Sequence, residues 1–137
     1  NYDLAKTISE SIIEANKDLI FLVPTGSQME KAGKKLNLKV ASEIFADRNY
    51  EDNGQLITRT NKNASIHDPI IVSENILEML DKSYIKCYSG KKIKTNIDTI
   101  CIHGDGLNAV ALATNIKNKL KENNIKQVNL NKLKKFL

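Results

Sequence analysis

Several residue types are scarce in this sequence of 137 residues, and each scarcity excludes a class of protein. Cysteine occurs only at Cys87 and Cys101, which is too few for the disulfide framework of a small secreted domain. No apolar run approaches the roughly 20 residues that a membrane-spanning helix needs, and no signal peptide begins the sequence. We therefore expect a cytoplasmic protein that does not enter a membrane.

Aromatic residues make up 5% of the chain and tryptophan is absent, which weakens the case for a nucleic-acid-binding protein. The formal net charge is +5, but the lysines are scattered along predicted helices and turns, as at Lys117, Lys119 and Lys121. No run of arginines interleaved with aromatics is available to grip phosphates and stack on bases. The basic stretch "NKLKKFL" at the C-terminus is interpreted as a frayed or docked tail. We expect no nucleic-acid partner.

Arginine is also scarce, because Arg48 and Arg59 are the only two in a chain that otherwise uses lysine. They flank an acidic stretch that contains a glycine. Arginine grips a planar carboxylate or phosphate through two parallel hydrogen bonds, which lysine cannot do. Both positions are therefore candidates for anion binding. Ion pairs with Asp47, Glu51 or Asp52 are the alternative.

The composition, 41% hydrophobic and 27% charged, is that of a globular protein, and the length suits a single α/β domain over 1–137. The chain begins at Asn1 rather than at a methionine, directly in a helical pattern. We therefore expect a fragment or a processed form of a longer protein.

The first part of the sequence predicts a helix, a strand and a second helix. The helix over 4–15 is expected to bury one stripe of side chains, namely Leu4, Ile8, Ile12 and Ala15. The run "LIFLV" is typical of a strand that is buried on both faces, as in a parallel sheet. Ser27 and Glu30 have the spacing of a capping box, so the second helix should begin there. Asn37 is expected to follow it in the left-handed conformation.

The later elements alternate in the same way. The pattern predicts a strand over 40–46, a long polar loop over 47–72, a helix over 74–83 capped by Ser73, a β-hairpin turning at Ser89 and Gly90, a strand over 99–103, a helix over 107–122 and a last strand over 126–130. Strands that alternate with helices indicate the α/β class, with mostly parallel strands and one β-hairpin. Loops as long as the polar one are uncommon in compact domains and tend to be functional.

Polar side chains follow two of the predicted strands at the point where each strand ends. Asp47 and Arg48 follow the second strand, and His103 and Asp105 follow the third. The carboxyl ends of parallel strands share one edge of a sheet, so these groups should converge although about 55 positions separate them in sequence.

Each of these residues has a second interpretation. His103 suits acid–base catalysis or metal binding, but a lone histidine is often structural. Asp105 is equally suited to cap the following helix, and Asp47 to pair with Arg48. His67 is interpreted as a loop residue. The sequence has no zinc-ligand spacing, P-loop, GxSxG motif or Cys/His dyad, so residue types alone indicate a hydrolase-like or ligand-binding edge.

Three segments together carry a longer ordered pattern: residues 25–59, "SIHD" at 65–68 and "TICIHGDGLNAV" at 99–110. In these segments "FADRNYEDNGQLITR" is followed some forty residues later by "CIHGD". The pattern resembles the C-terminal half of the LamB/YcsF family, the family of 5-oxoprolinase A subunits. The resemblance runs from about residue 1 to 125.

The resemblance implies part of an irregular (β/α) barrel related to sugar deacetylases. It also implies ATP-dependent opening of the lactam 5-oxo-L-proline to L-glutamate, together with partner subunits B and C. Activation by ATP would turn the amide oxygen into a leaving group. On this hypothesis Arg48 or Arg59 holds the substrate carboxylate, and Asp47, His103 and Asp105 handle protons. Whether a divalent metal takes part stays open.

The chain departs from the family in three places. Asn63 and Ala64 stand where members usually have Gly-Ala, and members have a proline near the position of Leu107. The family's N-terminal half has no counterpart here, and a complete (β/α) barrel needs about 250 residues. A part-barrel leaves open strand edges and an uncovered apolar face. We therefore expect a dimer or higher oligomer, or a non-barrel arrangement of the strands, and no oxoprolinase activity from this chain alone.

Two other functions stay open at this point. A metal-dependent, deacetylase-like hydrolase of a sugar or amide would need a divalent ion with His103 and Asp105 among its ligands. A non-catalytic assembly module would use the basic surface to meet subunits B and C.

Overall fold

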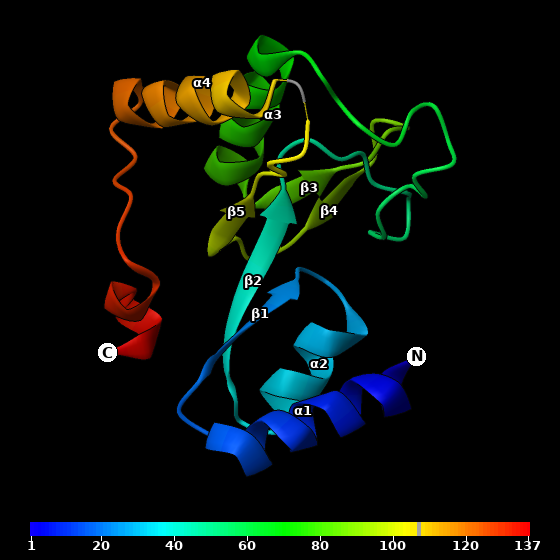
Figure 1. The fold of residues 1–137 in the computed structure, drawn as a ribbon, viewed down its shortest axis with the longest axis vertical. Coiled ribbons are helices and arrows are strands. Elements are labelled where there is room, and N and C mark those ends of the chain that lie inside the picture. Colours follow the sequence, from blue (N-terminus) through cyan, green and yellow to red (C-terminus); the bar gives the residue numbers. More distant parts are fainter. Residues whose placement is uncertain (107) are drawn as a thin grey trace.

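Parallel strands alternate with helices in the computed structural model, which describes residues 1–106 and 108–137 (Figure 1). The elements are α1 (Tyr2–Asn16), β1 (Ile20–Pro24), α2 (Gln28–Lys35), β2 (Lys39–Phe45), α3 (Pro69–Lys82), β3 (Tyr84–Lys86), β4 (Lys92–Lys94), β5 (Thr99–Cys101) and α4 (Ala109–Glu122), followed by 3-10 turns at Leu130–Lys132 and Lys134–Phe136. Leu107, near which members of the family were expected to have a proline, lies outside the described residues.

The strands form two sheets. The first has the order β1-β2-β5 with all strands parallel, and the second is the antiparallel hairpin β3–β4. Gly90 takes a φ of 92° in the hairpin turn, a conformation that glycine adopts without steric cost. The expected α/β class, with mostly parallel strands and one hairpin, is confirmed.

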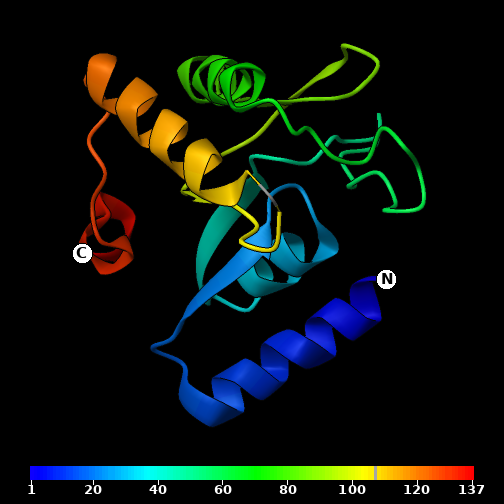
Figure 2. The same cartoon turned by 45° about the horizontal axis from the view of Figure 1, so that its top comes forward.

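Figures 1 and 2 place α1 and α2 at one end of the molecule and α3 and α4 at the other, with β1 and β2 between them. The larger apolar cluster lies at the α3–α4 end and includes Ile44 of β2, Ile76 of α3 and Ile116 of α4, which are all at most 3% exposed. A smaller cluster, built on Val23, Leu38 and Val40, lies at the α1–α2 end.

The second helix begins and ends as its sequence predicts. The Ser27 side chain accepts a hydrogen bond from the backbone N–H of Glu30 at 3.2 Å, and the Glu30 carboxylate accepts one from Gly26 at 2.5 Å. Asn37 follows the helix with a φ of 57°. The expected start of the helix at Ser27 and its left-handed end are confirmed, although the carboxylate of Glu30 binds the N–H of Gly26 and not that of Ser27 as in a capping box.

The predicted buried stripe of α1 is wrong. Leu4 is 61% exposed and Ile8 37% exposed, whereas Ala5 and Ser9 are almost completely buried. Ser9 can be buried because its hydroxyl donates to the carbonyl of Ala5 at 2.9 Å. Of the predicted stripe, Ile12 is partly buried and packs against the smaller cluster.

Two other expectations are also wrong at the level of single elements. The third helix begins at Pro69 and not at residue 74, because the Asp68 carboxylate accepts hydrogen bonds from the N–H groups of Ile70 and Ile71 and so caps the helix. Ser73 lies inside that helix. Strand β1 is not buried on both faces: Val23 is 1% exposed but Leu22, which points to the opposite face of the sheet, is 47% exposed.

The expected last strand over 126–130 is not formed. Asn124 takes a φ of 57° and ends α4, and the tail then runs without strand pairing to the 3-10 turn at Leu130–Lys132. The Lys135 ammonium lies 2.5 Å from the Asp98 carboxylate, so the basic tail is docked against the body of the protein. Among the described residues, no helix combines the length and the apolar character needed to cross a membrane.

Candidate functional site

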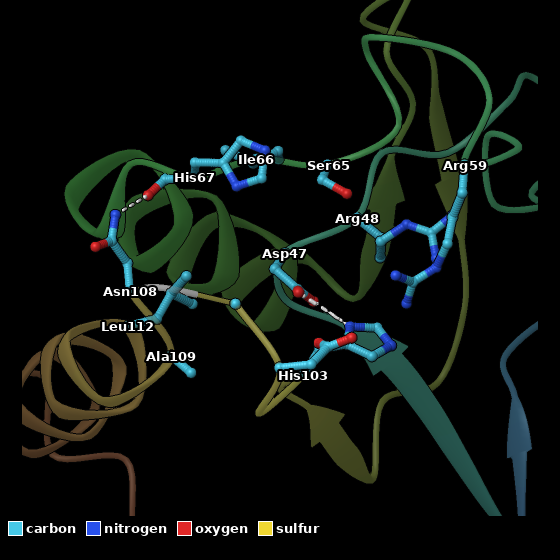
Figure 3. A pocket seen from close by; sticks show the side chains of 12 residues that line it. Asp47, Arg48, Arg59, Ser65, Ile66, His67, His103, Asn108, Ala109 and Leu112 are labelled. Carbon is cyan, nitrogen blue, oxygen red and sulfur yellow. Dashed lines mark hydrogen bonds and ion pairs between the residues drawn. The ribbon is translucent and has the colours of Figure 1, made fainter.

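A pocket of about 510 Å³ lies beyond the carboxyl ends of β2 and β5 (Figure 3). Its lining includes all five residues that the sequence singled out, namely Asp47, Arg48, Arg59, His103 and Asp105. Residues 65–67 and the start of α4 form the rest of the wall. The structure therefore brings the five predicted side chains together, and their individual roles stay predictions.

Asp47 and His103 meet because they continue the ladder between β2 and β5. In that ladder Glu43 pairs with Thr99 and Phe45 with Cys101, so every partner lies 56 positions further along the chain. Asp47 and His103 are separated by the same 56 positions. Each of the two residues lies two positions beyond the end of its strand, so the constant offset carries them to the same edge of the sheet.

The contact between the two side chains is a close one. Nδ1 of His103 lies 2.8 Å from one carboxylate oxygen of Asp47 and 3.0 Å from the other. Both side chains are partly exposed, at 25% and 17%. A carboxylate against Nδ1 favours the tautomer that carries its proton on Nδ1, which leaves the lone pair on Nε2 free to accept a proton.

The His103 ring is also held from one side. Phe45 stacks on it with ring centroids 5.8 Å apart and an interplanar angle of 18°. The Tyr50 hydroxyl in turn accepts a hydrogen bond from the backbone N–H of Phe45 at 2.7 Å. Burial raises the pKa of Tyr50 to about 12, so its hydroxyl stays protonated at neutral pH. The end of β2, and with it the histidine, is therefore well positioned.

Arg48 is buried beside the pocket and is only 7% exposed. Its Nε donates to the carbonyl of Ala64 at 3.1 Å, and its Nη2 donates to the carbonyl of Ile57 at 2.6 Å. Among the described residues it forms no ion pair with a carboxylate, so the alternative of a salt bridge to a nearby acidic residue is not observed.

Arg59 lies on the same wall but is exposed. Figure 3 shows Arg59 and Arg48 on the opposite side of the pocket from Asn108, Ala109 and Leu112. Within the described part of the chain, no hydrogen bond or ion pair engages the Arg59 side chain. The pocket therefore holds two guanidinium groups together with the partly buried carboxylate of Asp47 and the exposed carboxylate of Asp105. A guanidinium group that has no hydrogen-bond partner among the described residues, such as that of Arg59, is suited to grip an anionic ligand.

Asp105 is exposed and lines the pocket, but it does not cap the following helix. The N-cap of α4 is Asn108, whose side chain makes no capping hydrogen bond and instead donates to the carbonyl of His67 at 3.4 Å. The alternative of Asp105 as a helix cap is therefore not observed.

The sequence interpretation missed His67 and Ser65 as lining residues. The signal that could have placed them was the loop length, because a polar loop must return its backbone to some partner. Here the N–H of Ile66 donates to the carbonyl of Asp47 at 2.9 Å, which carries the neighbouring residues back to the end of β2.

Cys101 is the one cysteine near this site. Burial, followed by the charges of Glu43 and Asp47, raises the pKa of the Cys101 thiol. A thiol with a raised pKa is mostly protonated at neutral pH and is a poor nucleophile. The site is therefore better suited to acid–base chemistry through His103 than to covalent catalysis through the cysteine.

The side chains around the pocket include only a few metal-binding groups, namely Asp47, His67, His103 and Asp105. Within residues 1–106 and 108–137, no group of three or more His, Cys, Asp or Glu side chains converges as metal ligands do. The His103 nitrogen that faces Asp47 is already engaged. These residues do not by themselves fit a divalent ion, and no step of the reaction proposed for the site involves one.

Fold and site together define the class of this protein. It is an α/β protein whose parallel sheet carries a carboxylate–imidazole pair and an arginine-lined pocket at the carboxyl ends of its strands. Pockets at this edge are the usual place for small-molecule sites in parallel α/β folds.

The chain belongs to the LamB/YcsF family, whose sequence profile matches residues 1–135. It is 40% identical over 130 residues to the 5-oxoprolinase A subunit of Clostridium beijerinckii, a match that covers 95% of this chain and 51% of the relative. It is 37% identical over 121 residues to the 5-oxoprolinase A subunit of Nitrobacter hamburgensis, covering 88% of this chain and 48% of that relative. The family expected from the motifs is confirmed.

A solved structure supports the same assignment. The lactam utilization protein of Thermus thermophilus matches with a TM-score of 0.78 and 26% identity, over 90% of this chain and 49% of that one. The chain thus spans about half the length of the curated relatives and of the solved structure that it matches.

Proposed function

We propose that this chain provides part of the site of an ATP-dependent 5-oxoprolinase, which opens 5-oxo-L-proline to L-glutamate together with partner subunits B and C. The names of the similar proteins support the substrate class and the existence of further subunits. The observation that carries the proposal is the Asp47–His103 pair in one pocket with the arginines, because a lactam acid needs both proton transfer and carboxylate binding. The use of ATP by the reaction and the location of the protein in the cytoplasm are both part of this proposal.

The five residues divide the work by their positions. Arg59, exposed in the pocket, grips the substrate carboxylate, and the buried charge of Arg48 adds to the positive field. His103 accepts a proton at Nε2 from the attacking water, while Asp47 holds the ring and stabilises the imidazolium that forms. The proton that His103 has taken up then passes to the departing amide nitrogen, and Asp105, which is exposed at the pocket, can relay it.

ATP supplies the driving force by phosphorylating the amide oxygen, which makes an unstrained five-membered lactam easier to open. That transfer would release ADP. Water would then add to the carbonyl carbon, the bond from that carbon to the ring nitrogen would break, and the nitrogen would take up a proton, which leaves a glutamyl phosphate. A second water would release inorganic phosphate from it and give L-glutamate. The pocket volume of about 510 Å³ is ample for one small lactam acid.

The test uses a chimera that joins this chain to the half of the Clostridium beijerinckii relative that it does not match. With subunits B and C, we expect the chimera to form L-glutamate from 5-oxo-L-proline in an ATP-dependent reaction. His103→Gln should lower kcat by roughly 100-fold or more, the usual contribution of a general base. Full activity of the His103→Gln chimera would refute the proposed mechanism, whereas this chain with B and C alone should show no turnover.

We also propose that the isolated chain self-associates. In the described sheet β1 and β5 each lack a strand partner on their outer edge, and Leu4, Leu19 and Leu22 are 47–61% exposed. Open edges and exposed apolar side chains favour association. Sedimentation velocity should therefore report a dimer or larger species, and a monodisperse monomer would contradict this proposal.

A further inference from the structure

Arg48 and Arg59 line the same pocket but have different surroundings. The guanidinium group of Arg48 donates hydrogen bonds to backbone carbonyls, whereas that of Arg59 has no such partner among the described residues. Two of the three guanidinium nitrogens of Arg48 bind backbone carbonyls, one from Ile57 and one from Ala64. These two carbonyls stand at the two ends of the segment 57–64. The side chain therefore clamps the base of this segment as a fork.

The backbone around Arg48 reinforces the same connection. Asn49 donates its N–H to the carbonyl of Ala64 at 3.0 Å, and its carbonyl accepts from the N–H of Ile57 at 2.9 Å. Arg48 itself forms an antiparallel bridge with Ser65. The exit of β2 and the segment 57–66 are thus joined over both the backbone and the Arg48 side chain.

Arg59 lies inside the clamped segment, two residues after Ile57. Because its own side chain has no hydrogen bond within the described chain, the path of this segment decides where its Cα lies and therefore which region its guanidinium group can reach. Figure 3 shows the result, with the Arg59 group directed toward Arg48 and Asp47.

A lysine at position 48 could not do the same. Its ammonium is a compact charge that rotates freely, whereas the planar guanidinium presents donors in a fixed fork that reaches two acceptors at once. A clamp of two carbonyls in different parts of a loop needs that fork. This explains why one of the two arginines stands at this position in a chain that otherwise uses lysine.

We propose that Arg48 is a positioning residue: it clamps the segment 57–64 and thereby places Arg59 as the residue that contacts the anionic ligand. The clamp itself consists of the two hydrogen bonds from Arg48 to backbone carbonyls. Its link to ligand binding rests on the proposed function of Arg59 as the carboxylate-binding group.

The experiment compares the isolated wild-type chain with Arg48→Lys, Arg59→Gln and Asn49→Ala by NMR. Asn49→Ala is the matched control, since the Asn49 side chain donates to the carbonyl of Asn63 at 2.8 Å and so ties the same loop without touching Ile57. Three quantities are measured: amide exchange at Ile57 and Ile66, the Nε–Hε signal of Arg59, and affinity for 5-oxo-L-proline with acetate and inorganic phosphate as further probes.

Arg48→Lys should speed exchange at Ile57 by about tenfold, as expected for the loss of a hydrogen bond of a charged donor. It should also shift the Arg59 signal and weaken 5-oxo-L-proline binding by about tenfold. Arg59→Gln should weaken binding as much without changing exchange at Ile57. Asn49→Ala should leave both the Arg59 signal and the affinity close to wild type.

Two results would overturn the proposal. If Arg48→Lys weakens binding while exchange and the Arg59 signal stay as in the wild type, Arg48 contacts the ligand directly. If exchange rises while the Arg59 signal stays unchanged, the clamp does not position Arg59. If the wild type binds none of the three probes, the proposed binding role of Arg59 fails, and the exchange rates and the Arg59 signal still decide whether the clamp exists.

Discussion

The segments that follow β2 and β5 line the same pocket, but the first is held by many hydrogen bonds and the second is exposed. The segment after β2, residues 46–68, is fastened by backbone hydrogen bonds to Asp47 and Asn49 and by the buried Arg48 fork. The segment after β5 carries Gly104 and Asp105, both exposed, and no side-chain hydrogen bond of Asp105 is found within the described residues.

The two segments therefore have different roles: one holds side chains in position, and the other leaves space for a ligand. A long loop can stay ordered only if its backbone polar groups find partners, and the β2 segment finds them within itself and at the strand end. The β5 segment leaves open space: an added Cβ at Gly104 would have no atom within 4 Å. One wall of the pocket is therefore fixed before a ligand arrives, and the other leaves room for it.

The largest expected effect comes from removing the clamp of the fixed wall. Arg48→Ala should lower the free energy of unfolding by roughly 2–4 kcal/mol, because it removes two hydrogen bonds of a charged donor and leaves the buried carbonyl of Ile57 without its donor. The carbonyl of Ala64 keeps the backbone N–H of Asn49. Urea denaturation at fixed protein concentration measures this. Arg59→Ala is the control and should change stability by less than about 0.5 kcal/mol. Equal losses of stability from the two substitutions would mean that Arg48 does not fasten the segment after β2.

Tyr50 tests a second fastening of the same wall. Tyr50→Phe removes the acceptor for the buried N–H of Phe45 and should cost about 1–3 kcal/mol. Tyr88, which is 58% exposed, offers the matched control, and Tyr88→Phe should be nearly neutral. A neutral Tyr50→Phe would mean that the N–H of Phe45 finds another partner.

The glycines of the two segments should respond differently. Gly54 has a φ of 84°, and an added Cβ would lie 3.4 Å from Ile85, so Gly54→Ala should cost about 1–2 kcal/mol. Gly104 has neither a left-handed φ nor a close neighbour, so Gly104→Ala should leave the thermal midpoint nearly unchanged. If Gly104→Ala lowers the thermal midpoint more than Gly54→Ala does, the segment after β5 is the tightly packed one and the segment after β2 is not.

The smallest expected effect is a change in stability at alkaline pH, and it comes from Tyr50. Burial raises the pKa of Tyr50 from 10.0 to about 12, so its contribution to stability is fully present below pH 10 and is lost as pH rises toward 12. The stability difference between wild type and Tyr50→Phe should therefore be constant to about pH 10 and shrink above it. Because the lysines titrate alike in both proteins, a constant difference up to pH 12 would place Tyr50 in a solvated site.

The sequence predicted more of the site than of the packing. The convergence of Asp47 and His103 was predicted because both follow neighbouring parallel strands, although those strands end at Phe45 and Cys101, one and two residues before the expected ends. The constant offset of the ladder pairs the two residues. The stripe of α1 was misjudged because periodicity counts apolar side chains, whereas Ala5 and Ser9 are buried for their small size. The start of α3 was misplaced because both Asp68 and Ser73 can cap a helix.

The sequence by itself determined the order of helices and strands, the polar residues at the strand ends and the family, because these depend on local patterns and on residue identity. Only the tertiary structure decided which arginine is buried and which is exposed. The partners of Arg48 are backbone carbonyls 9 and 16 positions away. A carbonyl is present at every residue, so residue types alone cannot identify which carbonyl the path of the loop brings to the guanidinium group.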